Sequence, residues 1–143
     1  MIVQIDPLLA DTIRHASRKS YPYECCGLLT GEAHDDTIII TGVHPSENVT
    51  TNDPARSFEV DPKLRFDLMR LVEAMDDQTK IIGHYHSHPD NPAKPSKTDL
   101  SMAYEVEFIW LICASTETGA HDIGAFRPKS DQSDFDTLQV MID

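Results

Sequence analysis

The chain has 143 residues, of which 40% are hydrophobic, and this is enough to bury one core without disulfides or other staples. Its 24 acidic and 12 basic side chains give a formal net charge of −12, which argues against non-specific binding to nucleic acid or to an anionic membrane. We expect a single cytoplasmic domain over residues 1–143, because the chain shows no signal-peptide pattern, no disulfide framework and no apolar run long enough to cross a bilayer.

The first part of the chain predicts a strand, a helix and a hairpin, in that order. Residues 3–5 alternate as in an edge strand, and the Asp-Pro pair that follows supplies an N-cap and a proline at the first helical position. This helix is expected to end before Pro22, since the residue preceding a proline avoids the α region. Strands at 26–30 and 37–43 should then form an antiparallel pair.

The middle of the chain predicts a long loop and the clearest helix. Residues 46–56 are polar and aperiodic, and a loop of this length in a compact domain is more often functional than idle. A second Asp-Pro pair then starts a helix in which Leu64, Leu68, Leu71 and Met75 recur at helical spacing.

Strands dominate the second half of the chain. A strand over residues 80–87 is expected to lead into a stiff loop rich in proline, and Ser96 then opens a short helix. An apolar run at 108–114 is typical of a buried strand, and further strands are predicted at 123–126 and 137–142. Strands interleaved with helices, with hairpins near both ends, indicate the α/β class, in the α+β form of a mixed sheet with helices packed on it.

A metal-ligating pattern occupies the end of the predicted 80–87 strand. His86 and His88 are two residues apart, so on a strand both imidazoles point to one face, and Asp99 follows later in the chain. Two imidazoles and a carboxylate suit Zn²⁺ and leave a fourth position open for water, as in catalytic zinc sites. His84 shares the same face, so a site of three histidines without Asp99 stays open as an alternative.

Each of these residues also has a plain structural interpretation. A lone histidine is usually a hydrogen-bonded side chain, although three histidines so close together weaken that interpretation. Ser96 and Asp99 form an S-x-x-D capping box, which helices use without any chemistry and which is compatible with a ligand role for Asp99. Glu24 is either a solvated carboxylate near a turn or the base that a zinc-bound water requires.

At this point the residues resemble the signatures of a known family. The run from His86 to Asp99 reproduces the H-[ST]-H-x₇-S-x₂-D pattern of the JAMM metalloproteases, also called the JAB or MPN domain. The run from Pro22 to Gly31 resembles the family's N-terminal P-x-E-x-C-G-L-L-x-G element, and the two elements stand in the family's order. The likeness extends over residues 1–128, and the length of the chain resembles that of the small stand-alone prokaryotic members.

The resemblance assigns roles to five residues. Those that match the ligands of one Zn²⁺ per chain are His86, His88 and Asp99. Glu24 matches the general base that holds the metal-bound water and passes its proton to the leaving amine, and Ser96 matches the stabiliser of the oxyanion. His84 stands where most relatives have an aromatic or apolar residue, so we treat it as a neighbour of the site.

The resemblance also implies a fold and an activity. The fold is a curved mixed β-sheet flanked by helices, as in MPN and cytidine-deaminase-like domains. Members cut the bond after the C-terminus of ubiquitin or ubiquitin-like proteins, and small prokaryotic members process sulfur carriers. We therefore expect a zinc metallopeptidase, a deubiquitinase-like isopeptidase, that hydrolyses the bond after the Gly-Gly tail of such a carrier. The tail would lie extended beside a sheet edge, with residues 46–56 forming part of the groove.

Two other classes of function compete with this expectation. A non-catalytic MPN scaffold would bind a partner and cleave nothing, but scaffolds of that kind typically lose ligands that are all present here. A different zinc hydrolase, such as a deaminase, would need a P-C-x-x-C element that the sequence lacks. The carrier, the residue after the scissile bond and the oligomeric state stay open, as does whether the charge reflects a basic partner or a saline environment.

Overall fold

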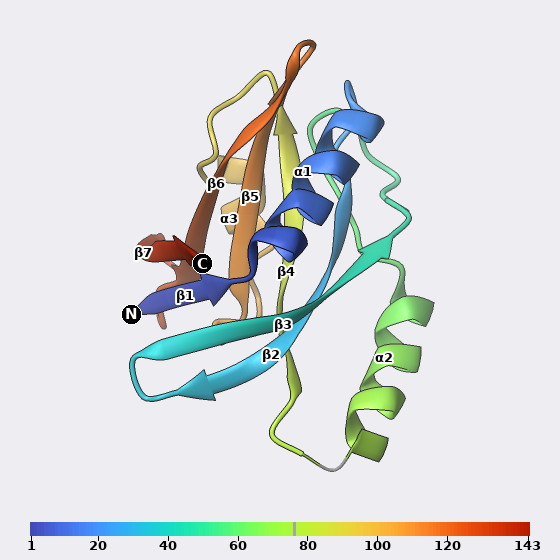
Figure 1. The fold of residues 1–143 in the computed structure, drawn as a ribbon. Coiled ribbons are helices and arrows are strands. Elements are labelled where there is room, and N and C mark those ends of the chain that lie inside the picture. Colours follow the sequence, from blue (N-terminus) through green and yellow to red (C-terminus); the bar gives the residue numbers. More distant parts are fainter. Residues whose placement is uncertain (76) are drawn as a thin grey trace.

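The computed structural model describes residues 1–75 and 77–143, except for the side chain at position 121. Helices and strands are mixed along these residues, which confirms the expected α+β class (Figure 1). In chain order the elements are β1 (Ile2–Ile5), α1 (Pro7–Ser20), β2 (Cys26–His34), β3 (Thr37–Ser46), α2 (Pro62–Met75), β4 (Lys80–Pro89), α3 (Lys97–Ser101), β5 (Ile109–Thr116), β6 (Gly119–Pro128) and β7 (Phe135–Ile142).

The strands form one sheet that closes on itself, in the order β1-β3-β2-β4-β5-β6-β7. The predicted hairpin of β2 and β3 is antiparallel as expected, and β4 and β5 run parallel at the centre. The expectation of an edge strand at residues 3–5 is wrong, because β1 pairs in parallel with β3 on one side and with β7 on the other. The alternation of apolar and polar residues in a short strand indicates which side chains face the core, but it does not indicate how many other strands pair with it.

Two hydrophobic clusters lie on the two faces of the sheet. The first contains Ala10 and Ile13 of α1 together with Tyr85 of β4, so α1 covers this face. The second contains Trp110 and its neighbours in space, among them Cys26, Phe58, Ile112 and Phe126. Because side chains of a strand alternate between faces, the even-numbered residues of β4 belong to the second face, away from α1. The candidate metal ligands of β4 therefore lie on the side opposite α1.

The helix boundaries follow from local chemistry. Asp6 caps α1 by accepting a hydrogen bond from the Leu8 N–H at 2.8 Å, and the helix ends at Ser20, before the Tyr-Pro pair as predicted. α2 also begins at the predicted proline and lies beside β4 at the lower right of Figure 1. None of the helices in the described part of the chain is long and apolar enough to cross a membrane.

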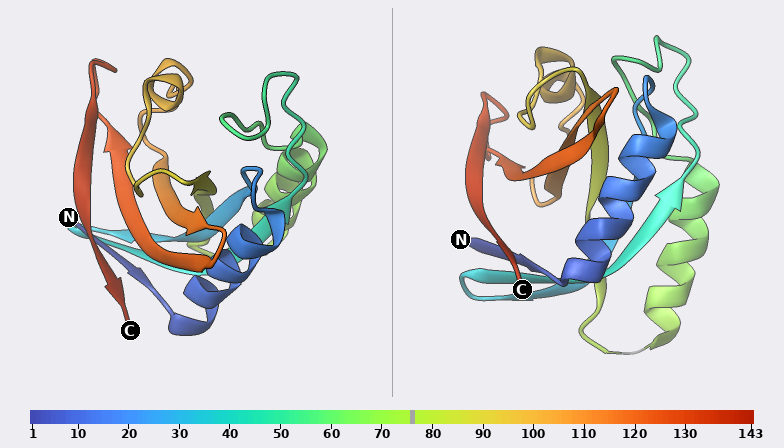
Figure 2. Two further views of the ribbon diagram at one scale, coloured as in Figure 1. Left: turned by 90° about the horizontal axis from the view of Figure 1, so that it is seen from above. Right: turned by 45° about the horizontal axis from the view of Figure 1, so that its top comes forward.

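The observed strand boundaries differ from the predicted ones more than the helix boundaries do. β2 and β3 extend beyond the expected 26–30 and 37–43, and β4 continues through Pro89. The extension of β4 matters for the site, because it keeps His88 in regular strand geometry, with its side chain on the same face as His86. The proline-rich segment that follows then crosses to α3, near the upper end of the sheet (Figure 2).

Candidate metal centre

Three side chains converge at the C-terminal end of β4. The Nε2 atoms of His86 and His88 are 3.0 Å apart, and Oδ2 of Asp99 lies 3.3 Å from the first and 3.0 Å from the second. Two ligands held about 2.0–2.1 Å from a tetrahedral zinc ion would be about 3.3 Å apart, so these separations fit one metal ion. All three residues are buried, and among the described residues they form a cluster that could hold a metal.

Neighbouring groups hold each of the three side chains in an orientation that allows it to bind a metal ion. Nδ1 of His88 lies 3.0 Å from the Pro92 carbonyl oxygen, which can accept only from an N–H, so Nε2 is left with its lone pair. The ring of Phe58 stacks on His86 at 4.2 Å between centroids. Asp99 accepts a hydrogen bond from the Ser96 N–H at 2.9 Å, which confirms the predicted capping box and fixes the carboxylate.

Burial and mutual contact set the charges of the cluster. Burial lowers the pKa of His86, which favours the neutral imidazole that binds a metal. The pKa of Asp99 is held below its usual range although burial opposes this, because the histidines and the Ser96 N–H stabilise the carboxylate. Burial is the largest single influence on the pKa of His88 and lowers it, but the hydrogen bonds with Asp99 and Pro92 and the negative charges of Asp99 and Glu24 together raise it. A metal would compete with a proton for Nε2 of His88.

Glu24 lies beside this cluster, just before β2. Its backbone is held on both sides, since its N–H donates to the Pro54 carbonyl at 2.8 Å and its carbonyl accepts from the Asn48 amide at 3.1 Å. Its Oε1 is buried without a hydrogen-bond partner among the described protein atoms. Burial raises the pKa of Glu24 to about 8, although the nearby His88 partly offsets this. The side chain is thus no solvated carboxylate but a buried carboxyl group next to the cluster.

Ser96 combines a structural contact with access to open space. Its Oγ accepts a hydrogen bond from the Asp99 N–H at 3.0 Å, which leaves the hydroxyl hydrogen able to donate elsewhere. Ser96 also lines a cavity of about 470 Å³ together with Glu24 and His88. A molecule in this cavity would contact Ser96 and, of the three clustered side chains, His88.

His84 does not join the cluster. Its ring lies 6.5 Å from that of His86 and packs at 4.3 Å against Trp110, and burial lowers its pKa to about 3. The alternative metal site, made of three histidines without Asp99, is therefore not formed among the described residues. His84 is instead a neighbour of the three clustered side chains, and its ring packs against Phe58 and Trp110 of the second hydrophobic cluster.

Asn48 was not identified from the sequence, although it connects the segments that carry the site. Its amide nitrogen donates to the carbonyls of Glu24 at 3.1 Å and Ser57 at 3.0 Å, and its Oδ1 accepts from the N–H groups of Thr50 and Glu59. These four bonds use the full capacity of the side chain. They fix the backbone of Glu24 and that of the residues flanking Phe58. No local pattern of the sequence reveals such a long-range role.

We expect Asn48→Ala to lower the free energy of unfolding by about 2–3 kcal/mol, because several partly buried backbone groups lose their partner at once. Denaturant unfolding of the variant measures this loss. Asn52→Ala, in the same loop, is the control, because Asn52 donates to Thr50 through its backbone N–H and this bond remains in the variant. A loss no larger than that of the control would show that Asn48 does not organise the loop.

Comparison with known proteins gives the family. The profile described as prokaryotic homologs of the JAB domain matches residues 7–127. The chain belongs to this family. The JAMM, JAB or MPN resemblance inferred from the two sequence elements is thereby confirmed.

Individual members of the JAB family are similar over most of the chain. A desampylase from Haloferax volcanii is 34% identical over 93 residues, which are 65% of this chain and 63% of that protein. A CysO-cysteine peptidase from Mycobacterium tuberculosis is 25% identical over 130 residues, or 89% of this chain and 82% of that protein. The solution structure of a Desulfitobacterium hafniense protein superimposes with a TM-score of 0.79 at 25% identity, covering 99% and 92% of the two chains.

Proposed function

We propose that this JAB-family chain is a zinc-dependent metallopeptidase that hydrolyses the bond after the Gly-Gly tail of a ubiquitin-like or sulfur-carrier protein. The observation that carries the proposal is the convergence of His86, His88 and Asp99 beside the buried carboxyl of Glu24. The names of two relatives support a peptidase activity of this kind, since one is named a desampylase and the other a CysO-cysteine peptidase.

The metal proposed for the cluster is Zn²⁺, because two imidazole nitrogens and one carboxylate oxygen at these separations suit a four-coordinate site with one open position. When bound there, zinc would acidify a water molecule and polarise the scissile carbonyl. The side chains that would hold it are His86, His88 and Asp99, with the Pro92 carbonyl fixing the tautomer of His88.

The protein's own side chains supply the proton transfers. Glu24 takes a proton from the attacking water and later delivers it to the leaving amine, a role suited to a buried carboxyl with a raised pKa. The Ser96 hydroxyl, which already accepts from the Asp99 N–H, keeps its own hydrogen to donate to the oxyanion of the tetrahedral intermediate. Glu24 is buried, so bulk water screens its interaction with the attacking water less than at the surface.

The cavity at the site fits an extended tail. It is lined by residues of two segments that face each other, Ala55 and Arg56 of the predicted substrate loop and residues 91–98 of the segment that follows β4. Glycine residues have no side chains to accommodate, so a Gly-Gly tail can approach the cluster closely. The contribution of residues 46–56 to the groove remains part of this proposal.

The deciding experiment is cleavage of a ubiquitin-like sulfur carrier extended by a short peptide past its Gly-Gly terminus. We expect the zinc-loaded chain to release a carrier ending in Gly-Gly, as measured by intact mass, and the chelator-treated chain to release none. Binding of the carrier without any cleavage by the zinc-loaded chain would instead support a non-catalytic scaffold.

A further inference from the structure

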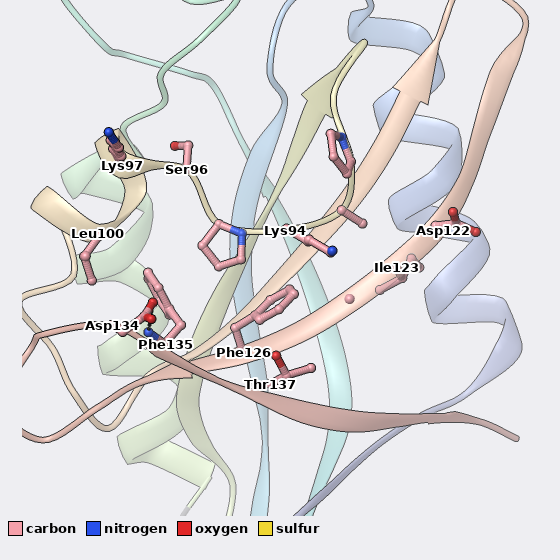
Figure 3. A pocket seen from close by; sticks show the side chains of 14 residues that line it. Lys94, Ser96, Lys97, Leu100, Asp122, Ile123, Phe126, Asp134, Phe135 and Thr137 are labelled. Carbon is pink, nitrogen blue, oxygen red and sulfur yellow. Dashed lines mark hydrogen bonds between the residues drawn. The ribbon is translucent and has the colours of Figure 1, made fainter.

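A second, larger cavity adjoins the proposed active site. Its volume is about 760 Å³, and it lies between the segment at 92–97, α3, β6 and β7 (Figure 3). The two cavities share the wall formed by Pro92, Lys94, Pro95 and Ser96. A chain that passes Ser96 in the first cavity would therefore have the second cavity beside it, across this wall.

The surface of this second cavity is suited to an apolar side chain. Phe126 and Phe135 contribute aromatic rings, and Leu100 and Ile123 add aliphatic groups at opposite sides of the cavity (Figure 3). The segment at 92–95 approaches β6 closely at Gly124, where a Cβ atom would be 2.6 Å from the Ala93 carbonyl oxygen. Glycine at this position lets the segment rest on the sheet and so form the wall between the cavities.

The wall also carries a cation without an ion-pair partner. Lys94 lines both cavities, and its side chain lies between Ser96 and Ile123 in Figure 3. Within the described residues no carboxylate forms a salt bridge with it, whereas Lys63 and Lys129 each pair with an aspartate at 2.8 and 2.6 Å. In a chain with 24 acidic and 12 basic side chains, an unpaired lysine beside the proposed site is available for an anionic ligand.

Two acidic residues limit where an anion could sit. Asp122 lies at one end of the second cavity, and Asp134 lies at the other, beside Phe135 (Figure 3). A bound carboxylate would be repelled from both ends and attracted toward Lys94, which lies between them, and toward Lys97, which also lines this cavity beside Ser96. The charges thus favour a carboxylate near the shared wall, close to Ser96.

We propose that the second cavity receives the residue that follows the scissile bond, with its side chain on the aromatic surface and its free α-carboxylate at Lys94. This inference rests on the proposed function and names the leaving group of the same reaction. Water adds across the amide, so the C–N bond breaks, the glycine gains a carboxyl group and the released amino acid gains the proton on its amine.

The alternatives for this cavity fit less well. A Gly-Gly tail has no side chain to occupy about 760 Å³ lined by aromatic rings. A lysine joined through its ε-amine to the tail presents no carboxylate next to the scissile bond, so it leaves Lys94 without an anion. A single C-terminal residue satisfies both the apolar surface and the cation. The proposed enzyme would therefore trim a terminal residue in preference to cutting an isopeptide bond.

The test compares one carrier in two forms, ending in Gly-Gly-Phe as the free acid and as the C-terminal amide. We expect kcat/KM of the wild-type chain to be about tenfold higher for the acid, because a charge-assisted hydrogen bond is lost in the amide. Lys94→Gln should reduce the ratio to about one by slowing the acid only. Lys80→Gln removes the same charge at the far end of β4 and should keep the ratio.

Binding separates this inference from the proposed function. The affinities of the acid and the amide for the Glu24→Gln variant can be measured by calorimetry without turnover, and Lys94→Gln in that background should abolish the difference. Equal rates or equal affinities for acid and amide in the presence of Lys94 would overturn the inference, and so would binding of neither form. Failure of the wild type to cleave either form, with the acid still bound more tightly, would overturn only the proposed function.

Discussion

Replacing Glu24 by Gln should abolish cleavage while leaving the bound metal in place. The change removes the proton acceptor but keeps the size of the side chain, and Glu24 lies outside the ligand cluster of His86, His88 and Asp99. Loss of a general base costs about 10²–10⁴ in rate, so kcat should fall by at least two orders of magnitude. Cleavage of the extended carrier and the zinc content of the same preparation are the two measurements.

The zinc measurement makes this prediction specific. A variant that lost both activity and zinc would show that Glu24 contributes to the ligand set, contrary to the geometry. Retained zinc with a kcat near that of the wild type would exclude Glu24 as the base. Glu32→Gln is a suitable control, because Glu32 lies on β2, which begins just after Glu24, and its side chain contacts His34 away from the cluster.

The second prediction concerns the ligands themselves. Asp99→Asn, His86→Ala and His88→Ala should each reduce the zinc content from about one ion per chain to nearly none, because two remaining ligands bind zinc weakly. The carboxylate of Asp99 also provides the only negative charge in the ligand cluster. Elemental analysis after dialysis against buffer containing a weak chelator measures this loss, and cleavage should disappear with it.

Stability gives an independent measurement of metal binding. A ligand that binds only the folded state raises the unfolding free energy by RT ln(1 + [L]/Kd), about 2.7 kcal/mol at one hundred times Kd. Zinc should therefore raise the melting temperature of the wild type and of an exposed Asp11→Asn control on α1, but not that of Asp99→Asn. Retained zinc in all three ligand variants would contradict the assignment of the site.

Much of the proposed site could be predicted because its geometry is local in sequence. The spacing of His86 and His88 fixes a common strand face, and the capping box places Asp99 at the third position of α3. Both features depend on a few consecutive residues. The approach of α3 to the end of β4 depends on the short proline-rich segment that joins the two elements.

Features that depend on distant contacts were not predicted. The pairing of β1 with β7 joins the two ends of the chain, the Asn48 bonds reach back to Glu24, and Phe58 packs on His86 only because its loop returns to the sheet. No periodicity encodes such partners, since each depends on the path of the whole chain. The cavity beside Lys94 likewise exists only once the segment at 92–97 rests on β6 and faces β7.

The parallel pairing of β1 with β7 has a consequence for how the protein forms during translation. Ile5 pairs with Ile142, so the barrel can close only after Ile142 has left the ribosome. At 5–20 residues per second, synthesis from Asp99 to Ile142 takes about 2–9 s. All five proposed site residues are made before that interval begins. The two histidines and two carboxylates of the proposed site are thus all present in the nascent chain before the strands that close the barrel have been made.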